Sequence, residues 1–248
     1  MGGQGLVMVF VLLLAAFLTL WNNLVNLWPG FQRWYAVINL TLVAALLLVA
    51  RMQGLSWQSL GLAPERAVSG LAWGSVAFLV VALALALLFR VSWGRRLLRD
   101  GRIADLTASR LAFLALIRIP LGTVALEEIA FRGVLFGAWG QGQSVAAAVI
   151  GSSIVFGLWH IAPTIVLYNL DHPAVSGRAR LLAAATGVIV TTAAGIALVL
   201  LRMVAGSLIA PAMAHIATNS LGALVAFLAH RMGERVTTSR RPSTPSRS

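Results

Sequence analysis

Residues 111–137, LAFLALIRIPLGTVALEEIAFRGVLFG, form an apolar stretch long enough to cross a membrane, yet they carry two adjacent acids and an arginine near its centre. The hydrocarbon core of a bilayer is about 30 Å thick, which about 20 helical residues span at 1.5 Å each. Glu127, Glu128 and Arg132 therefore lie at membrane depth. Each ionised group there costs at least a few kcal/mol. The three side chains must face protein or water rather than lipid.

The rest of the chain has the same apolar character. Of its 248 residues, 59% are hydrophobic and 10% are charged, whereas soluble domains are about 45–50% apolar and about 25% charged. Cysteine is absent, which excludes disulfides and cysteine nucleophiles. We predict an all-α, polytopic membrane helix bundle of about seven transmembrane helices, within a range of six to eight, with a catalytic polar cluster inside. The predicted spans are residues 6–28, 35–50, 71–89, 111–137, 145–168, 181–200 and 206–229.

The basic residues predict the orientation. All 19 are arginines, set against 7 acids for a net charge of +12. With the N-terminus outside, 14 arginines fall on the cytoplasmic side, and only Arg51, Arg66 and Arg202 fall on the opposite side. The positive-inside rule then favours N-terminus out and C-terminus in. We predict a multi-pass protein of a bacterial inner or plasma membrane, whose basic loop and tail meet anionic lipid headgroups and bind no nucleic acid.

Three regions follow from this pattern. Residues 1–110 hold N-terminal transmembrane helices, an interfacial segment and the basic loop, and residues 111–230 hold the catalytic core. Residues 231–248 form a disordered basic cytoplasmic tail, since Thr237–Ser248 contains no apolar side chain. The interfacial segment, Gly54–Leu62, places several apolar side chains at a bilayer edge.

Two other predicted spans also carry polar side chains. His160 ends VFGLWH in the fifth span, and His215 lies in AHIATN in the seventh. Asn219 follows His215 by four residues and Phe156 precedes His160 by four, so each pair shares one helical face. Taken singly, each polar group has a structural explanation as interhelical hydrogen bonding. Several costly groups on three spans favour a functional site instead.

We expect the two adjacent glutamates to have different partners. Glu128 and Arg132 are spaced i and i+4 with the acid first, the favourable orientation for a helical ion pair. Glu127 is rotated about 100° from Glu128 on the helix and points to a different neighbour. A carboxylate and two imidazoles can activate a water directly, or bind a divalent ion that does so.

These residues resemble the motifs of the CPBP (CAAX protease and bacteriocin-processing) family of intramembrane endopeptidases, which includes type II CAAX prenyl endopeptidases. EEIAFR (127–132) is similar to its EExxxR motif, FGLWH (156–160) to FxxxH, and HIATN (215–219) to HxxxN. All three occur in order and on separate predicted spans, from about Glu127 to Asn219.

The resemblance implies roles for the site residues. Glu127 activates the attacking water with help from His160, and His215 and Asn219 stabilise the tetrahedral oxyanion. Glu128, Arg132 and Phe156 support the site. The implied activity is hydrolysis of a peptide bond in a small peptide or a membrane-anchored protein, with prenylated CAAX-type proteins among the candidate substrates.

The cofactor stays open at this point. One divalent ion such as zinc could be held by Glu127, His160 and His215 with water as the fourth ligand, as in a metalloprotease. A metal-free mechanism with glutamate-activated water is the alternative. The spread of the three side chains over three helices leaves the geometry undetermined.

Two other functional classes remain as alternatives. A non-catalytic membrane scaffold or bacteriocin-immunity protein could keep the polar site without turnover. A proton-coupled transporter also uses intramembrane Glu and His, and ranks behind the scaffold. Other protease chemistries fit poorly, because the chain has no HExxH, no Asp within a span, and no GxSG nucleophile motif.

Overall fold

The computed structural model describes residues 3–25, 28, 30–171 and 176–239, and every regular element among them is helical. Seven helices in this part of the chain are long and apolar enough to cross a membrane, which confirms the predicted all-α polytopic bundle of seven. They are Gly5–Val25, Phe31–Met52, Pro64–Arg90, Ala108–Gly142, Val145–Leu170, Gly177–Ala205 and Ile209–Met232.

Several spans are composed of more than one helical segment. The N-terminal elements are α1 (Gly3–Val25), α2 (Phe31–Met52), the 3₁₀ turn η1 (Pro64–Arg66), α3 (Ala67–Arg90) and α4 (Ser92–Leu97). The fourth span joins α5 (Ala108–Phe113), η2 (Leu114–Val124), α6 (Ala125–Glu127), η3 (Glu128–Leu135) and α7 (Phe136–Gly142). The remaining elements are α8 (Val145–Trp159), α9 (Ile161–Asp171), α10 (Gly177–Ala205), α11 (Ile209–Ile216), η4 (Ala217–Leu221) and α12 (Gly222–Ser239).

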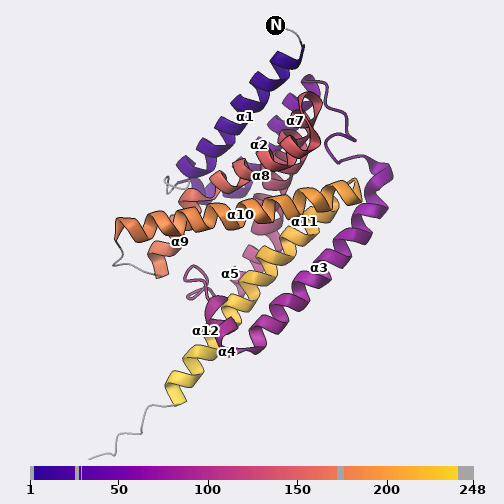
Figure 1. Ribbon diagram of the computed structural model, residues 1–248. Helices are drawn as coiled ribbons and strands as arrows, with labels where there is room; N and C mark the ends of the chain where they lie inside the picture. The colour runs from indigo at the N-terminus through magenta and orange to yellow at the C-terminus, as the bar shows by residue number, and fades with distance from the viewer. Residues whose placement is uncertain (1–2, 26–27, 29, 172–175, 240–248) are drawn as a thin grey trace, which may run out of the picture.

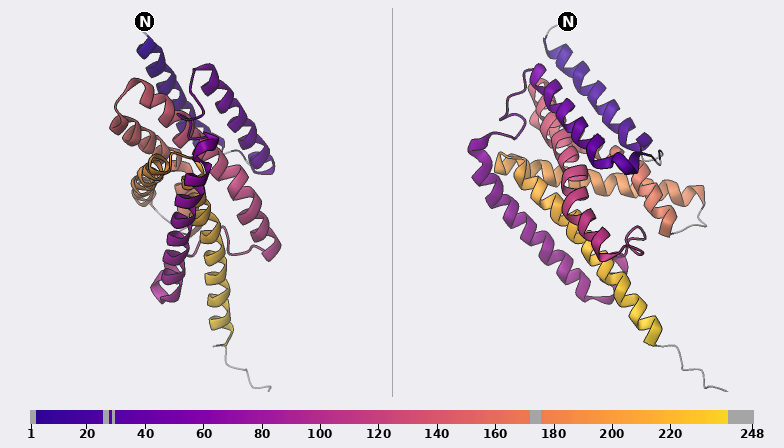
Figure 2. Two further views of the ribbon diagram at one scale, coloured as in Figure 1. Left: turned by 90° about the vertical axis from the view of Figure 1, so that its right-hand side faces the viewer. Right: turned by 180° about the vertical axis from the view of Figure 1, so that it is seen from behind.

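The helices form one bundle in which the N-terminal spans pack on the C-terminal ones. α3 lies along α11, and α1 lies along α8 (Figure 1). α10 crosses the direction of α3 and α11 steeply and contacts α8, α9 and α11 (Figure 1). The left view of Figure 2 shows α10 nearly end-on. The segments of the fourth span contact α1, α2, α8 and η4, so this span lies in the interior of the bundle.

Helix α3 shows how an apolar helix is divided between protein and lipid. Only Gly70 and Gly74 are buried among its residues. A Cβ at Gly70 would come within 2.6 Å of Ser207 Oγ, and one at Gly74 within 2.6 Å of Met213 Sδ. Small residues therefore let α3 approach α11 closely. The outer face is a row of exposed apolar side chains, as expected for contact with lipid: Val68, Leu71, Trp73, Val76, Leu79, Val80, Leu83 and Leu87.

The main core surrounds the fourth span. Phe131 stacks edge-on against Phe156 and Trp159, with ring centroids 5.1 and 5.3 Å apart. The segment between α2 and η1 contributes Leu55 and Leu60, which are fully buried in this cluster. The sequence predicted both leucines at the bilayer edge. They turn inward because the segment folds back on itself, with positive φ at its glycines 54 and 61.

The C-terminal end differs from the predicted tail. α12 continues to Ser239, so residues 231–239 are helical where the sequence predicted disorder. The predicted disorder of residues 240–248 falls outside the described residues.

Candidate active site

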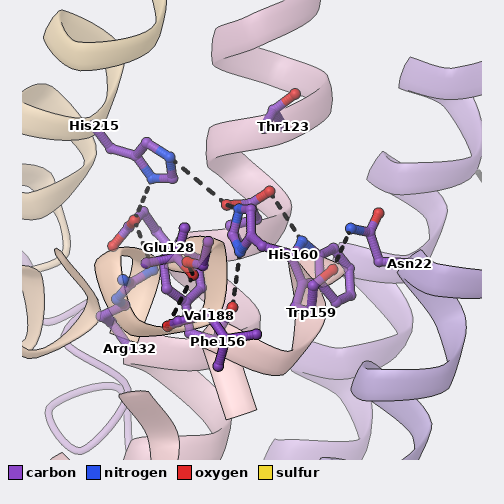
Figure 3. Close-up of polar contacts among 12 residues, drawn as sticks. Asn22, Thr123, Glu128, Arg132, Phe156, Trp159, His160, Val188 and His215 are labelled. Atoms are coloured by element: carbon purple, nitrogen blue, oxygen red, sulfur yellow. Dashed lines mark hydrogen bonds and ion pairs between the residues drawn. The ribbon is translucent and has the colours of Figure 1, made fainter. Parts of the chain in front are cut away.

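Three helical segments bring one carboxylate and two imidazoles together. Glu127 is the last residue of α6, His160 lies at the break between α8 and α9, and His215 lies on α11. His215 Nε2 is 3.6 Å and His160 Nε2 is 3.9 Å from the same oxygen, Glu127 Oε2. Both acidic side chains and His215 are buried, and His160 is partly exposed. Figure 3 shows the two imidazoles, His215 on one helix and His160 beside Trp159 at the end of another.

The two oxygens of Glu127 have different environments. Trp159 Nε1 donates a hydrogen bond of 3.1 Å to Oε1. Oε2 is buried and accepts no hydrogen bond from the described residues. Buried polar atoms are almost always hydrogen-bonded, so an unpaired carboxylate oxygen indicates a place for water or substrate. The separations from both imidazoles are too long for direct hydrogen bonds.

In each imidazole, the hydrogen bond of Nδ1 determines which way Nε2 faces. His160 Nδ1 is 2.8 Å from the carbonyl oxygen of Phe156. A carbonyl only accepts, so Nδ1 carries the proton, and Nε2 of the neutral ring is an acceptor facing Glu127. His215 Nδ1 is 2.7 Å from Glu128 Oε1, which fixes that ring in the same way. Both side chains thus turn Nε2 toward the Glu127 carboxylate.

Glu128 serves a separate group of partners from Glu127. Its Oε1 accepts from His215 Nδ1 and also from Arg132 Nη1 at 3.2 Å. Arg132 is fully buried, with its guanidinium carbon 3.9 Å from the centre of the Phe156 ring. Charge pairing and the ring face together offset the cost of an arginine at this depth. Figure 3 shows this chain of contacts from His215 through Glu128 to Arg132.

Asn219 is the one predicted site residue that the structure does not join to the cluster. It is half-buried in η4, one turn beyond His215. Among the described residues, none hydrogen-bonds to its side chain. The other predicted residues, Glu127, Glu128, Arg132, Phe156, His160 and His215, lie in one connected group.

Comparison with known families agrees with this arrangement. Residues 108–221 match the family model of the Rce1-like type II CAAX prenyl endopeptidases. These residues, slightly fewer than half of the chain, are similar to the Rce1-like family. The match spans the fourth span through η4 and so includes all six clustered residues and Asn219. Similarity to this family implies a protease, a peptide-bond hydrolase of the CAAX type. Comparisons with curated proteins and with solved structures give no significant match.

The Rce1-like core departs from α-helical geometry at two of its motifs, a feature that sequence analysis missed. η3, which begins at Glu128, and η4, which contains Asn219, are π-helical. π-helical turns are rare and often occur at functional sites. A third π-helical segment, η2, contains Pro120, which lacks the N–H of a regular ladder. That proline was the one sequence signal of irregular backbone in this span.

Two adjacent asparagines of α1 hold the chain at His160, and sequence analysis missed them as well. Asn22 Nδ2 donates to the carbonyl of Trp159 at 2.8 Å, and Asn23 Nδ2 donates to that of Leu158 at 2.9 Å. Asn23 Oδ1 accepts from the backbone N–H of Ala162 at 2.7 Å. They satisfy the backbone groups that the break between α8 and α9 leaves open. The signal was available as two adjacent amides in a mostly apolar first span.

We expect Asn23→Ala to lower both the stability of the protein and its turnover. It leaves the Ala162 N–H and the Leu158 carbonyl without their partner, which costs about 1–3 kcal/mol. The break then loosens and His160 shifts. Thermal unfolding of the purified protein and cleavage rate at saturating substrate would measure the two effects. Thr41→Ala, on an exposed face of α2, is the matched control. Wild-type stability in Asn23→Ala would contradict the assignment.

The donor set for a metal ion is present, but its placement does not form a metal site. Glu127, His160 and His215 are the residue types that bind zinc. Within the described residues, no group of three or more His, Cys, Asp or Glu side chains is arranged to hold an ion. The separations of 3.6 and 3.9 Å are wider than the roughly 3.4 Å between ligands about 2.1 Å from a tetrahedral zinc. We derive no catalytic step through a metal.

Proposed function

We propose that this chain is an intramembrane endopeptidase that hydrolyses a peptide bond in a small peptide or a membrane-anchored protein, with prenylated CAAX-type proteins among the candidates. The observation that carries the proposal is the convergence of His160 Nε2 and His215 Nε2 on the unpartnered oxygen of Glu127. Similarity of the core to the Rce1-like family supports the reaction class.

In the proposed mechanism, a water bound at Glu127 Oε2 is the nucleophile. Its second partner is His160 Nε2, which accepts a hydrogen bond and orients the water. Glu127 takes a proton as the water oxygen attacks the scissile carbonyl carbon. The carbonyl oxygen becomes a tetrahedral oxyanion. Glu127 then gives its proton to the leaving nitrogen as the C–N bond breaks, which releases an acid and an amine.

The proposed oxyanion donors lie on the seventh span. His215, when protonated, donates from Nε2, and its other nitrogen stays bonded to the Glu128 carboxylate. Asn219 has an uncommitted amide one turn away and would complete the pair when substrate is bound. Fixed donors aimed at a developing negative charge are worth up to a few kcal/mol each.

The proposal also includes the location of the protein, its orientation and its lipid contacts. We propose a bacterial plasma-membrane location with the N-terminus out and the C-terminus in, supported by the arginine distribution over seven spans. Anionic lipid headgroups would contact the basic loop before the fourth span and the C-terminal end.

The decisive test compares protein termini in membranes of cells that express the wild type or Glu127→Ala at equal levels. Termini found only with the wild type would support the proposal and name substrates. Identical termini, with both proteins folded and inserted, would overturn it in favour of a non-catalytic scaffold or immunity protein. Loss of proton-coupled uptake in the variant, with termini unchanged, would indicate a transporter instead.

A further inference from the structure

A cavity lined by two arginines lies away from the Glu127 cluster and shares no residue with it. Its volume is about 380 Å³, within the roughly 300–1,000 Å³ of small-molecule sites. It is formed where the segment before α3, the start of α8 and the end of α10 meet. The lining residues are Gln58, Arg66, Phe136, Val145, Arg202, Met203, Val204 and Gly206.

Arg202 is the buried charge of this cavity. Its side chain is nine-tenths buried, and Nη2 donates to the carbonyl oxygen of Ser59. The guanidinium carbon lies 4.6 Å from the centre of the Phe136 ring. Nε is buried and has no hydrogen-bond partner among the described residues. One carbonyl and one ring face do not neutralise a buried guanidinium.

Arg66 adds a second positive charge at the cavity mouth. It is exposed, and its stem passes along Gly206, where a Cβ would come within 3.2 Å of Arg66 Cδ. Neither Arg66 nor Arg202 forms an ion pair within the described ranges. The glycine, whose φ is +67°, therefore makes room for one arginine beside the other.

The cavity holds two of the few arginines on the predicted non-cytoplasmic side. Only Arg51, Arg66 and Arg202 fall on the predicted non-cytoplasmic side. Arg51 lies over the Trp57 ring and bonds to the Leu55 carbonyl, so it holds the local fold. The other two line this cavity. Two arginines placed against the prevailing bias, without acidic partners, indicate an anionic ligand.

Helix ends strengthen the positive potential at this edge. α3 begins immediately after Arg66, and α11 begins three residues after Gly206. Ser207 Oγ accepts from the Ile209 N–H at the start of α11, and the Ala67 N–H of α3 bonds to the Pro64 carbonyl. The positive ends of both helix dipoles favour an anion here.

We propose that this cavity binds a phosphate group on the non-cytoplasmic side, carried by an anionic lipid headgroup or present as free phosphate. Arg202 and Arg66 would contact the phosphate oxygens, and Gln58 would donate to the headgroup. The apolar side chains of Val145, Met203 and Val204 offer a surface for the first part of an acyl chain. This site is separate from the basic loop and tail and does not depend on the proposed protease activity.

The test measures ligand affinity of the purified full-length protein in neutral detergent. Short-chain phosphatidylglycerol, short-chain phosphatidylcholine and inorganic phosphate are titrated separately, with thermal stabilisation as the readout. We expect Arg66→Gln to weaken phosphatidylglycerol binding about five-fold, since one arginine near an anionic headgroup contributes about that factor. Arg202→Gln should weaken it further. Arg33→Gln removes an exposed arginine from the predicted cytoplasmic side, outside the basic loop and the tail, and should leave the affinity unchanged.

Each outcome either supports or overturns the proposed site, or identifies the source of the phosphate. Stabilisation by phosphatidylglycerol alone assigns a lipid headgroup, and equal stabilisation by inorganic phosphate assigns a free anion. Wild-type affinity in Arg66→Gln, or equal stabilisation by phosphatidylcholine in every variant, would overturn the site. Because Arg66 is exposed, its variant remains informative even if Arg202→Gln does not fold. A loss of proteolysis with Glu127→Gln leaves this measurement unaffected.

Discussion

Glu127→Gln is expected to reduce peptide-bond hydrolysis by about 10²–10⁴-fold, the range that a general base contributes. The amide keeps the size of the carboxylate, and its oxygen can still accept from Trp159 Nε1, which lies 3.1 Å from Glu127 Oε1. It cannot take a proton from water. The loss should therefore fall on turnover, while the fold stays intact. Removing a buried charge should leave thermal stability unchanged or higher.

The measurement is the cleavage rate of a substrate taken from the comparison of membrane termini, with unfolding temperature measured on the same samples. Glu65→Gln removes an exposed acid outside the membrane core and should retain the wild-type rate. Activity of Glu127→Gln within ten-fold of the wild type would exclude Glu127 as the base. The proposed water site at its unpartnered oxygen would then lose its support.

The fold was predictable because its main signals are local. Apolar runs of about 20 residues between arginines predict spans, and the seven helices agree with that count. The boundary between the sixth and seventh spans shows the limit. Arg202 was the sequence signal for the break, but it lies inside α10, and the chain turns at Gly206 with φ of +67°. A glycine in an apolar run does not reveal by itself that it adopts the left-handed conformation.

The composition of the site was predictable, and its geometry was not. The cost of charge at membrane depth draws attention to Glu127, Glu128 and Arg132 without any coordinates. The i, i+4 spacing predicts the pair of Glu128 with Arg132, and the structure has that pair. The π-helical segments, and the contact of Asn23 with the break at His160, depend on packing between spans far apart in sequence. The local sequence pattern does not predict such contacts.

Arg132→Met is expected to destabilise the protein by about 3–5 kcal/mol, the cost of leaving one member of a buried ion pair alone. Arg132 is fully buried, and removing it leaves Glu128 with only His215 as a charged partner. The exposed pair of Arg102 with Asp100 is the matched contrast, and Arg102→Gln should cost only about 0–1 kcal/mol.

The double variant Glu128→Gln/Arg132→Met separates charge pairing from packing. It removes both charges, keeps side chains of similar volume at both positions, and leaves an apolar side chain against the Phe156 ring. Replacing a whole buried pair by neutral groups is often neutral or stabilising by about 1–4 kcal/mol, so the double variant should be more stable than Arg132→Met alone. Reversible unfolding in mixed detergent gives the coupling free energy of the cycle. Additive effects of the two substitutions would mean that Arg132 acts by filling space beside Phe156, and that Glu128 is held in place by His215.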